Sequence, residues 1–313
     1  MKTKIFDSKQ IRIAAKLIVN GKLVAFPTET VYGLGANAFD AKAIKKIFVA
    51  KGRPSDNPLI VHVSNIDQIK DLAFINDKAK LLMDKFWPGP LTVVLRKKQT
   101  VPKEVTAGLD TVAIRMPSNK IAFELIKLSK VPIAAPSANR SGRPSSTSFE
   151  HVYEDLNGRI DGIIKSKDCD IGLESTVVDL TSKKPLLLRP GAITFEQLKK
   201  FFPNISIYHS KTKKPRSPGM KYRHYSPEAK VLLFERSAKD KIEQYKKEYE
   251  LSGKKVEMIN ITDLDYASKK LFKKFRIFDK KKIDYILVSG CNEKGIGLAL
   301  MNRLRKAATL IIK

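Results

Sequence analysis

Two cations in one short loop have the types and spacing that bind phosphate. Lys51 and Arg53 stand two residues apart, and Pro54 and Pro58 stiffen the loop that carries them. Both cations can reach one phosphate chain, and the arginine can bind it through two parallel hydrogen bonds. Asn57 adds a neutral donor. An ordinary solvated charged turn is the alternative, and this loop alone does not decide between the two.

A second segment, residues 135–147, is dense in hydroxyl, amide and guanidinium groups. It follows a short apolar strand, and loops at the carboxyl ends of strands are where α/β proteins bind ligands. A flexible serine-rich surface loop is the alternative, but Pro136, Pro144 and the adjacent apolar strand count against it. The strand ends at 173–176 and 189–191 also carry polar groups, but each alone is more typical of structure than of function.

The sequence lacks the residue patterns that metal-dependent catalysis, serine nucleophiles and cysteine nucleophiles usually require. The four histidines have no metal-ligand spacing, and the sequence has no Ser-His-Asp order. Cys169 and Cys291 lie far apart, which excludes a CxxC site and fits a reducing compartment in which both are inert. His62 alternates within an apolar strand and by itself is typical of a core histidine. Residues 290–297 lack GxGxxG and GK[ST], so they predict a structural turn.

These segments must be positioned by the elements of a first domain, residues 1–210. Apolar periodicity and turn signals predict helices at 11–19, 41–50, 77–86 and 121–128, and strands at 23–26, 59–63, 91–95, 111–115, 132–135, 162–165, 175–180 and 186–189. Residues 32–35 are small and turn-forming. Helices and strands mix without a strict βαβ repeat, which favours an open, twisted, mixed α/β sheet.

Residues 229–313 are more regular. The predicted strands are 230–234, 255–259, 284–289 and 309–312, and the predicted helices are 238–249, 266–275 and 297–308. Strictly alternating strands and helices indicate a small, Rossmann-like, doubly wound parallel sheet.

Residues 211–228 are predicted to link the two domains. The stretch 211–227 holds six basic and no acidic residues, three prolines and one glycine. A plain linker carries few aromatic side chains, whereas Met220, Tyr222, His224 and Tyr225 stand here. We therefore expect this linker to dock onto another group.

The 313 residues carry a formal net charge of +28. That charge suggests a polyanionic partner such as nucleic acid or nucleotide phosphates, although a lysine-rich proteome would give the same value. A hydrophobic content of 42% suffices for a packed core. No apolar run reaches the ~18 residues of a membrane span and the N-terminus lacks a signal-peptide core, so we expect a cytoplasmic protein.

Taken together, these segments resemble the YrdC/Sua5 family. The resemblance rests on PTETVYGLG at 27–35, Lys51-x-Arg53, WPGPLT at 87–92, RMP at 115–117, PSAN at 136–139, EST at 174–176 and LRPG at 188–191. The linker stretch SPGMKYRHYSP at 217–227 resembles the long, Sua5-type members and is absent from the short ones.

The resemblance implies an L-threonylcarbamoyladenylate synthase, a nucleotidyltransferase. Such enzymes join L-threonine, bicarbonate and ATP and release pyrophosphate, and their product serves the threonylcarbamoyl (t6A) modification of tRNA. It also implies Mg²⁺ on the ATP phosphates, but no carboxylate cluster in the sequence identifies a ligand for that ion.

The family roles carry over to matching positions of this chain. The residues that resemble ATP-binding ones are Lys51, Arg53, Asn57, Thr111, Ser137, Asn139, Ser145, Arg189 and Tyr225, with Lys51 and Arg53 neutralising charge during catalysis. The residues that resemble the threonine pocket are Thr30, His62, Arg115, Ala135 and Ser175, with Arg115 on the amino-acid carboxylate. The resemblance thus moves His62 from core to ligand contact.

Two other functions stay open at this point. A non-enzymatic RNA-binding factor would use the same basic surface, but the aromatic motifs of sequence-specific RNA readers are missing. Carbamoyl transfer of the hydrogenase-maturation kind is the other, but those related proteins carry zinc-finger and acylphosphatase segments that this chain lacks.

The linker is expected to act as a lid, with Tyr225 reaching the nucleotide and water excluded from a labile adenylate. Truncation before Lys211 should therefore leave a folded first domain with weakened turnover, measured as pyrophosphate release. Undiminished turnover would show that the linker only connects the two domains and does not act as a lid.

Overall fold

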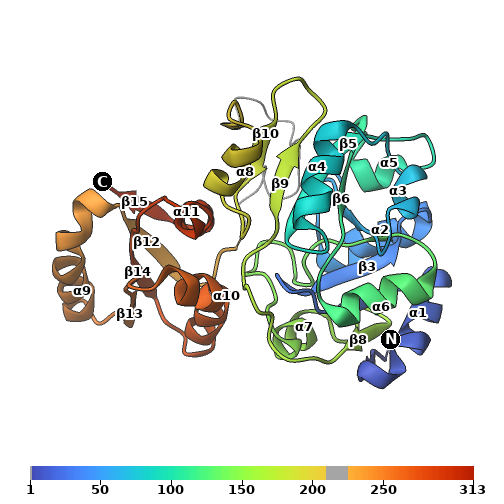
Figure 1. Ribbon diagram of the computed structural model, residues 1–313. Helices are drawn as coiled ribbons and strands as arrows, with labels where there is room; N and C mark the ends of the chain where they lie inside the picture. The colour runs from blue at the N-terminus through green and yellow to red at the C-terminus, as the bar shows by residue number, and fades with distance from the viewer. Residues whose placement is uncertain (1, 209–224) are drawn as a thin grey trace. The chain divides into compact units, whose positions relative to one another are not determined.

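The structure is a computed structural model that describes residues 2–208 and 225–313. The predicted linker 211–228 lies outside the described residues except for 225–228, and so do Met220, Tyr222 and His224. The described chain packs into two units, labelled by element in Figure 1. Residues 2–141 and 145–208 form the first unit, and Gly142–Pro144 and residues 225–313 form the second.

A large mixed sheet organises the first unit. Its eleven described strands follow the order β1-β8-β2-β3-β7-β4-β6-β5-β9-β10-β11. Their bounds are β1 Lys4–Phe6, β2 Val24–Phe26, β3 Gly33–Asn37, β4 Ile60–His62, β5 Leu91–Arg96, β6 Thr111–Arg115, β7 Ile133–Ala134, β8 Gly162–Ile164, β9 Thr176–Asp179, β10 Leu186–Arg189 and β11 Ser206–Ile207. Strand β6 is parallel to β4 and antiparallel to β5. The expected open, mixed α/β sheet is confirmed.

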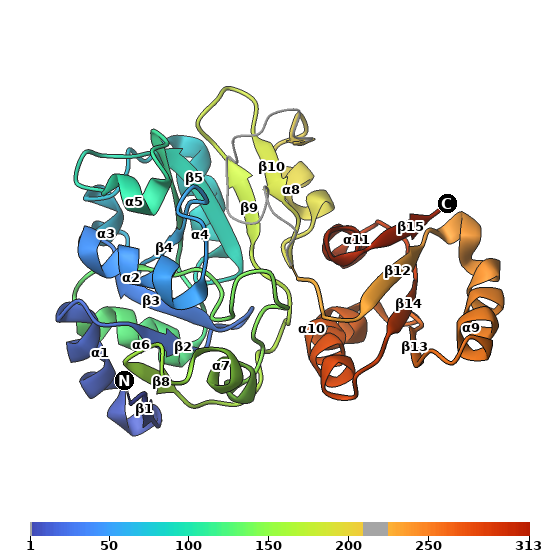
Figure 2. The ribbon, with the colours of Figure 1, turned by 180° about the vertical axis from the view of Figure 1, so that it is seen from behind.

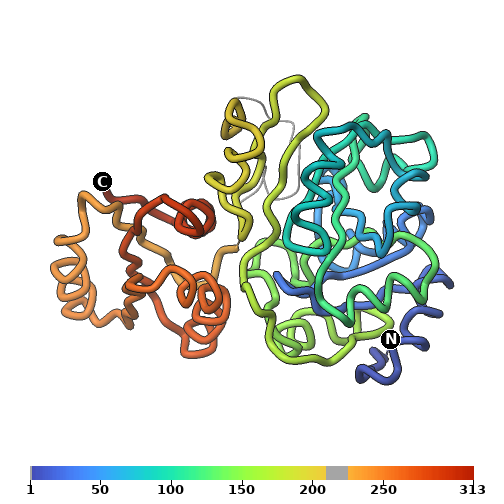
Figure 3. Tube along the Cα trace, viewed as in Figure 1, coloured from blue at the N-terminus to red at the C-terminus, as the bar shows by residue number. Residues whose placement is uncertain are grey.

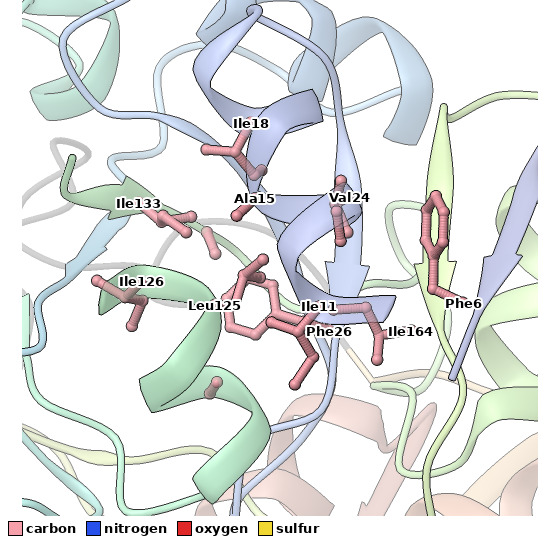
Figure 4. Packing of buried hydrophobic residues seen from close by; sticks show 13 residues of the cluster. Phe6, Ile11, Ala15, Ile18, Val24, Phe26, Leu125, Ile126, Ile133 and Ile164 are labelled. Carbon is pink, nitrogen blue, oxygen red and sulfur yellow. The ribbon is translucent and has the colours of Figure 1, made fainter. Parts of the chain in front are cut away.

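Two helices cover one face of this sheet and close a hydrophobic core cluster there (Figure 4). Helix α1 (Ile11–Val19) buries apolar residues three and four positions apart, as its periodicity predicts. Helix α6 (Lys120–Ser129) begins where the Asn119 side chain accepts hydrogen bonds from two backbone N–H groups. Phe26 and Ile133 of the sheet pack in the same cluster.

The remaining helices of the described first unit are α2 (Ala41–Lys51), α3 (Asp67–Lys70), α4 (Asp77–Phe86), α5 (Lys103–Thr106), α7 (Phe149–Leu156) and α8 (Phe195–Phe201), with a 3₁₀ turn at Ser8–Gln10. Helices α2 and α5 contact each other and lie toward the viewer in Figure 2. Sequence reasoning missed α7 and α8, although each has a hydroxyl cap, Ser148 and Thr194 respectively. None of the described helices is both long and apolar enough to span a membrane.

The expectation of a turn at residues 32–35 is wrong, because strand β3 begins at Gly33. Strand β3 pairs antiparallel with β2 and with β7. A Cβ on Gly35 would lie 2.7 Å from Ile133 Cγ2 and 2.8 Å from Phe26 Cε1. Glycine is therefore needed here for close packing inside a strand and not for a chain reversal.

The second unit holds a four-stranded parallel sheet in the order β13-β14-β12-β15. Its elements are β12 Lys230–Phe234, a 3₁₀ turn Arg236–Lys241, α9 Ile242–Leu251, β13 Val256–Ile259, α10 Leu264–Lys280, β14 Tyr285–Ser289, α11 Ile296–Ala307 and β15 Leu310–Ile312. Figure 3 traces this path in orange and red. The predicted alternation of strands and helices is confirmed, and α10 is longer at both ends than predicted.

Three residues from the middle of the polar loop 135–147 belong to the second unit. Within that unit the backbone N–H of Ser226 donates to the carbonyl of Gly142 at 3.0 Å. A buried guanidinium, that of Arg276 on α10, donates to the carbonyl of Pro144 at 2.6 Å. The first domain expected from the sequence, residues 1–210, is one continuous stretch. In the structure, Gly142–Pro144 of that stretch pack with the second unit instead.

A side chain at Gly191 should destabilise the first unit. Its Cβ would lie 2.7 Å from the carbonyl oxygen of Glu174 and would also meet the backbone N of Thr176, neither of which can rotate away. We expect Gly191→Ala to lower the free energy of unfolding by roughly 1–3 kcal/mol, measured in urea.

Gly253→Asn is the matched control for that substitution. Gly253 has a φ of +76° with open space around it, and asparagine tolerates the left-handed region. This variant should unfold close to the wild type, and an equal loss in both variants would contradict the packing argument at Gly191.

Candidate functional site

The two polar loops singled out from the sequence are joined by the Lys51 side chain. Helix α2 ends at Lys51, and Gly52 in the left-handed conformation then turns the chain into the Arg53 loop. Lys51 is buried, and its Nζ donates to the carbonyls of Ser137, at 2.5 Å, and Asn139. The structure therefore brings these two segments together, 86 residues apart in sequence.

Within the second loop, short hydrogen bonds fix the serine and asparagine side chains. Ser137 Oγ donates to Asn139 Oδ1 at 2.5 Å. Ser145 Oγ donates to Glu174 Oε1 at 2.5 Å, and both residues are buried. Glu174 was not singled out as a site residue, although it stands beside Ser175 in the EST segment.

Hydrogen bonds from the Arg53 side chain to backbone carbonyls of its own loop stabilise the first polar loop. Arg53 Nη2 donates to the carbonyls of Asn57, at 3.2 Å, and Pro58, at 3.4 Å. The Asn57 side chain is fully buried, yet its amide N and O have no hydrogen-bond partner among the described residues. A buried amide without partners is costly, so this one is suited to receive a polar ligand.

Arg115 at the end of β6 is the central cation of the second group. Its Nη1 donates to Thr30 Oγ1 at 2.8 Å and its Nε to the carbonyl of Gly89 at 3.3 Å. Its Nη2 lies 2.6 Å from Glu29 Oε1. Arg115 is 3% exposed and Glu29 6% exposed, so the ion pair is buried.

The pKa of Glu29 reflects this pairing. Burial by itself would raise the pKa, but the charge of Arg115 and its hydrogen bond outweigh burial, and the pKa lies below its ordinary value. The backbone amides of Glu29 and Ser118 lower the pKa further. Glu29 is therefore a carboxylate at neutral pH.

His62 at the end of β4 is uncharged. Burial, followed by the positive charge of Arg115, lowers the pKa of the ring to about 3. The ring meets Phe26 edge-on with centroids 6.1 Å apart. Its Nδ1 is buried and has no hydrogen-bond partner among the described residues, so it is available to a polar ligand.

A third group joins the ends of three neighbouring strands, β5, β9 and β10. The hydroxyls of Thr92 and Ser175 are 2.8 Å apart. Arg189 donates through Nη2 to Ser175 Oγ at 3.1 Å and through Nε to the Ser175 carbonyl at 3.0 Å. The side chains of all three residues are buried, so Ser175 Oγ is held in one place.

Three predicted site residues lie apart from these groups or contribute only backbone. Thr111 begins β6, at the opposite end of that strand from Arg115. Ala135 donates its backbone N–H to the carbonyl of Ile60 at 2.8 Å. Tyr225 belongs to the second unit, where its ring stacks on Phe272 with centroids 5.3 Å apart. Nucleotide contacts by Thr111 and Tyr225 stay predictions.

The described residues contain no group of three histidine, cysteine or acidic side chains that could hold a metal ion. The two carboxylates of the site, Glu29 and Glu174, are engaged by Arg115 and Ser145. The described side chains therefore do not offer Mg²⁺ an oxygen cage of their own.

The two cysteines are buried thiols. Burial raises the pKa of Cys169 far above its usual range and that of Cys291 to about 11. The thiolate is the nucleophilic form, so both side chains stay protonated at neutral pH.

Two family models match adjacent parts of the chain. The Sua5/YciO/YrdC model, described as telomere recombination, matches residues 16–191. The model described as the C-terminal domain of threonylcarbamoyl-AMP synthase matches residues 193–309.

Similar proteins match over nearly the whole length. Threonylcarbamoyl-AMP synthase of Pyrococcus abyssi is 50% identical, covering 96% of this chain and 94% of that protein. The enzyme of that name from Bacillus subtilis is 47% identical with the same coverage. The crystal structure of P. abyssi Sua5 complexed with L-threonine superposes with a TM-score of 0.95 at 48% identity, covering 99% of each chain.

The lowered pKa of His62 predicts acid sensitivity. The unfolded chain, with a histidine pKa near 6.5, binds this proton below that pH, whereas the folded chain does not until about pH 3. Stability is therefore full above pH 6.5 and falls as pH drops, by about 2 kcal/mol at pH 5 from this group. His62→Gln should lose less unfolding free energy than the wild type between pH 7 and pH 5 in urea titrations. Equal losses would show that His62 titrates normally in the folded protein.

Proposed function

Since this chain belongs to the Sua5/YrdC family, with the C-terminal domain of the long members, we propose that it is an L-threonylcarbamoyladenylate synthase. It condenses L-threonine, bicarbonate and ATP and releases pyrophosphate, and its product serves t6A modification of tRNA. The observation that carries the proposal is one buried polar arrangement. Lys51 joins the two polar loops, and in the same unit Arg115 of β6 pairs in register with His62 of β4, whose ring Nδ1 has no hydrogen-bond partner among the described residues.

Threonine would be held at the ends of β4 and β6. The Arg115 guanidinium would bind the α-carboxylate, since it is a buried cation at a sheet edge. Thr30 Oγ1, His62 Nδ1 and Ser175 Oγ would supply neutral hydrogen-bonding groups. The complex of P. abyssi Sua5 with L-threonine supports this substrate.

ATP would be held by the two loops that Lys51 joins. Arg53, Asn57, Ser137, Asn139, Ser145 and Arg189 are the proposed ATP-binding residues, together with Lys51, Thr111 and Tyr225. Lys51 holds the backbone of the second loop in place, and its charge adds to the positive potential there. Arg53 would neutralise phosphate charge during catalysis.

The chemistry requires positioning more than a protein nucleophile. The α-ammonium group of threonine first loses a proton to solvent, and the resulting amine attacks the carbon of bicarbonate with loss of water, or of CO₂ with loss of a proton, to form a carbamate. A carbamate oxygen then attacks the α-phosphorus of ATP, and pyrophosphate leaves. The carbamate and the ATP phosphates are anionic, so fixed cations and hydrogen-bond donors stabilise the transition state of the second step.

Three further parts of the proposal follow from this reaction. Mg²⁺ would be bound chiefly by the ATP phosphates and water, since the described side chains offer no cage for it. A cytoplasmic location fits a chain whose two cysteines are free thiols. The adenylate would pass to the machinery that transfers threonylcarbamoyl to tRNA. The net charge of +28 would also favour direct binding of tRNA, which is a polyanion.

Arg53→Ala and Ser137→Ala should each reduce pyrophosphate release that depends on both threonine and bicarbonate by at least about 100-fold, because each would remove a group that the proposal assigns to the ATP phosphates. Release is measured with each amino acid in turn, and the adenylate is identified by mass spectrometry.

Lys294→Ala is the matched control, because it removes a cation from the glycine-rich turn 290–297 of the second unit. It should keep wild-type turnover. Full activity in either Arg53→Ala or Ser137→Ala would refute the proposed site, and release independent of threonine would refute the proposed reaction.

A further inference from the structure

Glu29 is a buried carboxylate to which neither the sequence pattern nor the family resemblance gave a role. It stands between two threonines of the PTET segment, just after β2. Its Oε1 is 2.6 Å from Arg115 Nη2. The backbone amides of Glu29 itself and of Ser118 also lie near the carboxylate and lower its pKa, although neither carboxylate oxygen meets strict hydrogen-bond geometry with the described residues.

The remaining contacts of Arg115 show which edge of the guanidinium can change partner. Its Nη1 and Nε are engaged by the Thr30 hydroxyl and the Gly89 carbonyl, both of which are neutral. Nη2 faces only the charge of Glu29 among the described residues. The edge that a substrate carboxylate would use is therefore the edge that Glu29 occupies in the free protein.

An amino acid carries its carboxylate and its ammonium group on one carbon atom. When the α-carboxylate binds Arg115 Nη2, its ammonium group must come close to the carboxylate that contacts the same nitrogen atom. We propose that Glu29 binds the α-ammonium group of L-threonine, which makes it a specificity-determining residue of the pocket. This rests on the proposed function, because it takes threonine as the substrate.

Charge balance favours this exchange of partners. In the free protein the buried Arg115 and Glu29 neutralise each other. A bound zwitterion would give each of them a new partner of opposite charge, so no charge in the pocket is left without a partner. A neutral residue in place of Glu29 would leave the buried ammonium group without a counter-ion.

The other residues of the pocket do not suit an ammonium group as well. Thr30 and Ser175 offer only neutral hydroxyls, which already take part in hydrogen bonds. Glu174, the other buried carboxylate of the site, accepts a hydrogen bond from Ser145 Oγ at 2.5 Å. Glu29 is the carboxylate that already lies against the residue assigned to the substrate carboxylate.

The test compares two ligands by calorimetry on the full-length protein. One is L-threonine, and the other is (2S,3R)-2,3-dihydroxybutanoate, in which a hydroxyl replaces the amine. In Glu29→Gln we expect threonine to bind roughly 10- to 100-fold more weakly, because a charged hydrogen bond is lost. The dihydroxy acid should bind as well as before or more tightly, since an anion without an ammonium group no longer competes with Glu29 for Arg115.

The affinities of Glu29→Gln for the two ligands should differ from wild type in opposite ways, with threonine binding more weakly and the dihydroxy acid as well or more tightly. This difference distinguishes ligand recognition from a purely structural role. If Glu29 only holds Arg115 in place, both ligands lose affinity by the same factor, and that result would overturn the proposal. Unchanged threonine binding would overturn it too. If Glu29→Gln does not fold in a thermal-unfolding assay, Glu29→Asp keeps the charge and should retain the preference for threonine over the dihydroxy acid. Loss of that preference would count against the proposal.

Glu104→Gln provides the matched control. Glu104 is another largely buried carboxylate with a cation partner, Lys45 at 3.5 Å, and it belongs to the short helix α5. Both affinities should stay at wild-type values in this variant. Wild-type protein that binds no threonine and releases no threonine-dependent pyrophosphate would instead refute the proposed function, which is a different outcome from a failure at Glu29.

Discussion

A buried guanidinium needs a counter-charge, and Arg115 finds it in Glu29 on a segment 86 residues earlier in the chain. Removal of one partner of such a pair typically costs about 3–5 kcal/mol, because the other charge stays buried. The pair ties the segment after β2 to the end of β6, and Thr30 and the Gly89 carbonyl complete the same arrangement. The proposed threonine pocket is therefore held together by an ion pair in the free protein, which lowers the cost of ordering it on binding.

Lysine has a different role from arginine in this site. The flexible Lys51 stem brings its ammonium group against two backbone carbonyls, so that one residue fixes the course of a loop that comes from elsewhere in the sequence. The arginines hold carboxylates, hydroxyls and carbonyls with a rigid planar group. Few of the 60 basic residues take part in this arrangement, so the net charge of +28 does not describe the site.

Local patterns in the sequence predicted most elements of the described fold, including α1, α4, β6, β10 and β12 with their bounds. Strand β3 was missed because its glycines signal a turn locally, whereas their packing against Phe26 and Ile133 is a tertiary effect. Lys51 and Arg53 were found from their spacing in a proline-stiffened loop, whereas the roles of Arg115 and Arg189, which end strands, came from the family resemblance. Glu29 was missed because its partner is distant in the sequence, and no local pattern announces such a pair.

The three residues Gly142–Pro144 make the two units less modular than the family models suggest. The models divide the chain near residue 192, yet this short stretch packs with the C-terminal unit through Ser226 and Arg276. In recombination between family members, a C-terminal domain exchanged alone would be combined with a 142–144 loop that evolved together with a different C-terminal domain. A chimera would therefore have to inherit residues 142–144 together with the domain that holds them, as one unit of exchange that is discontinuous along the gene.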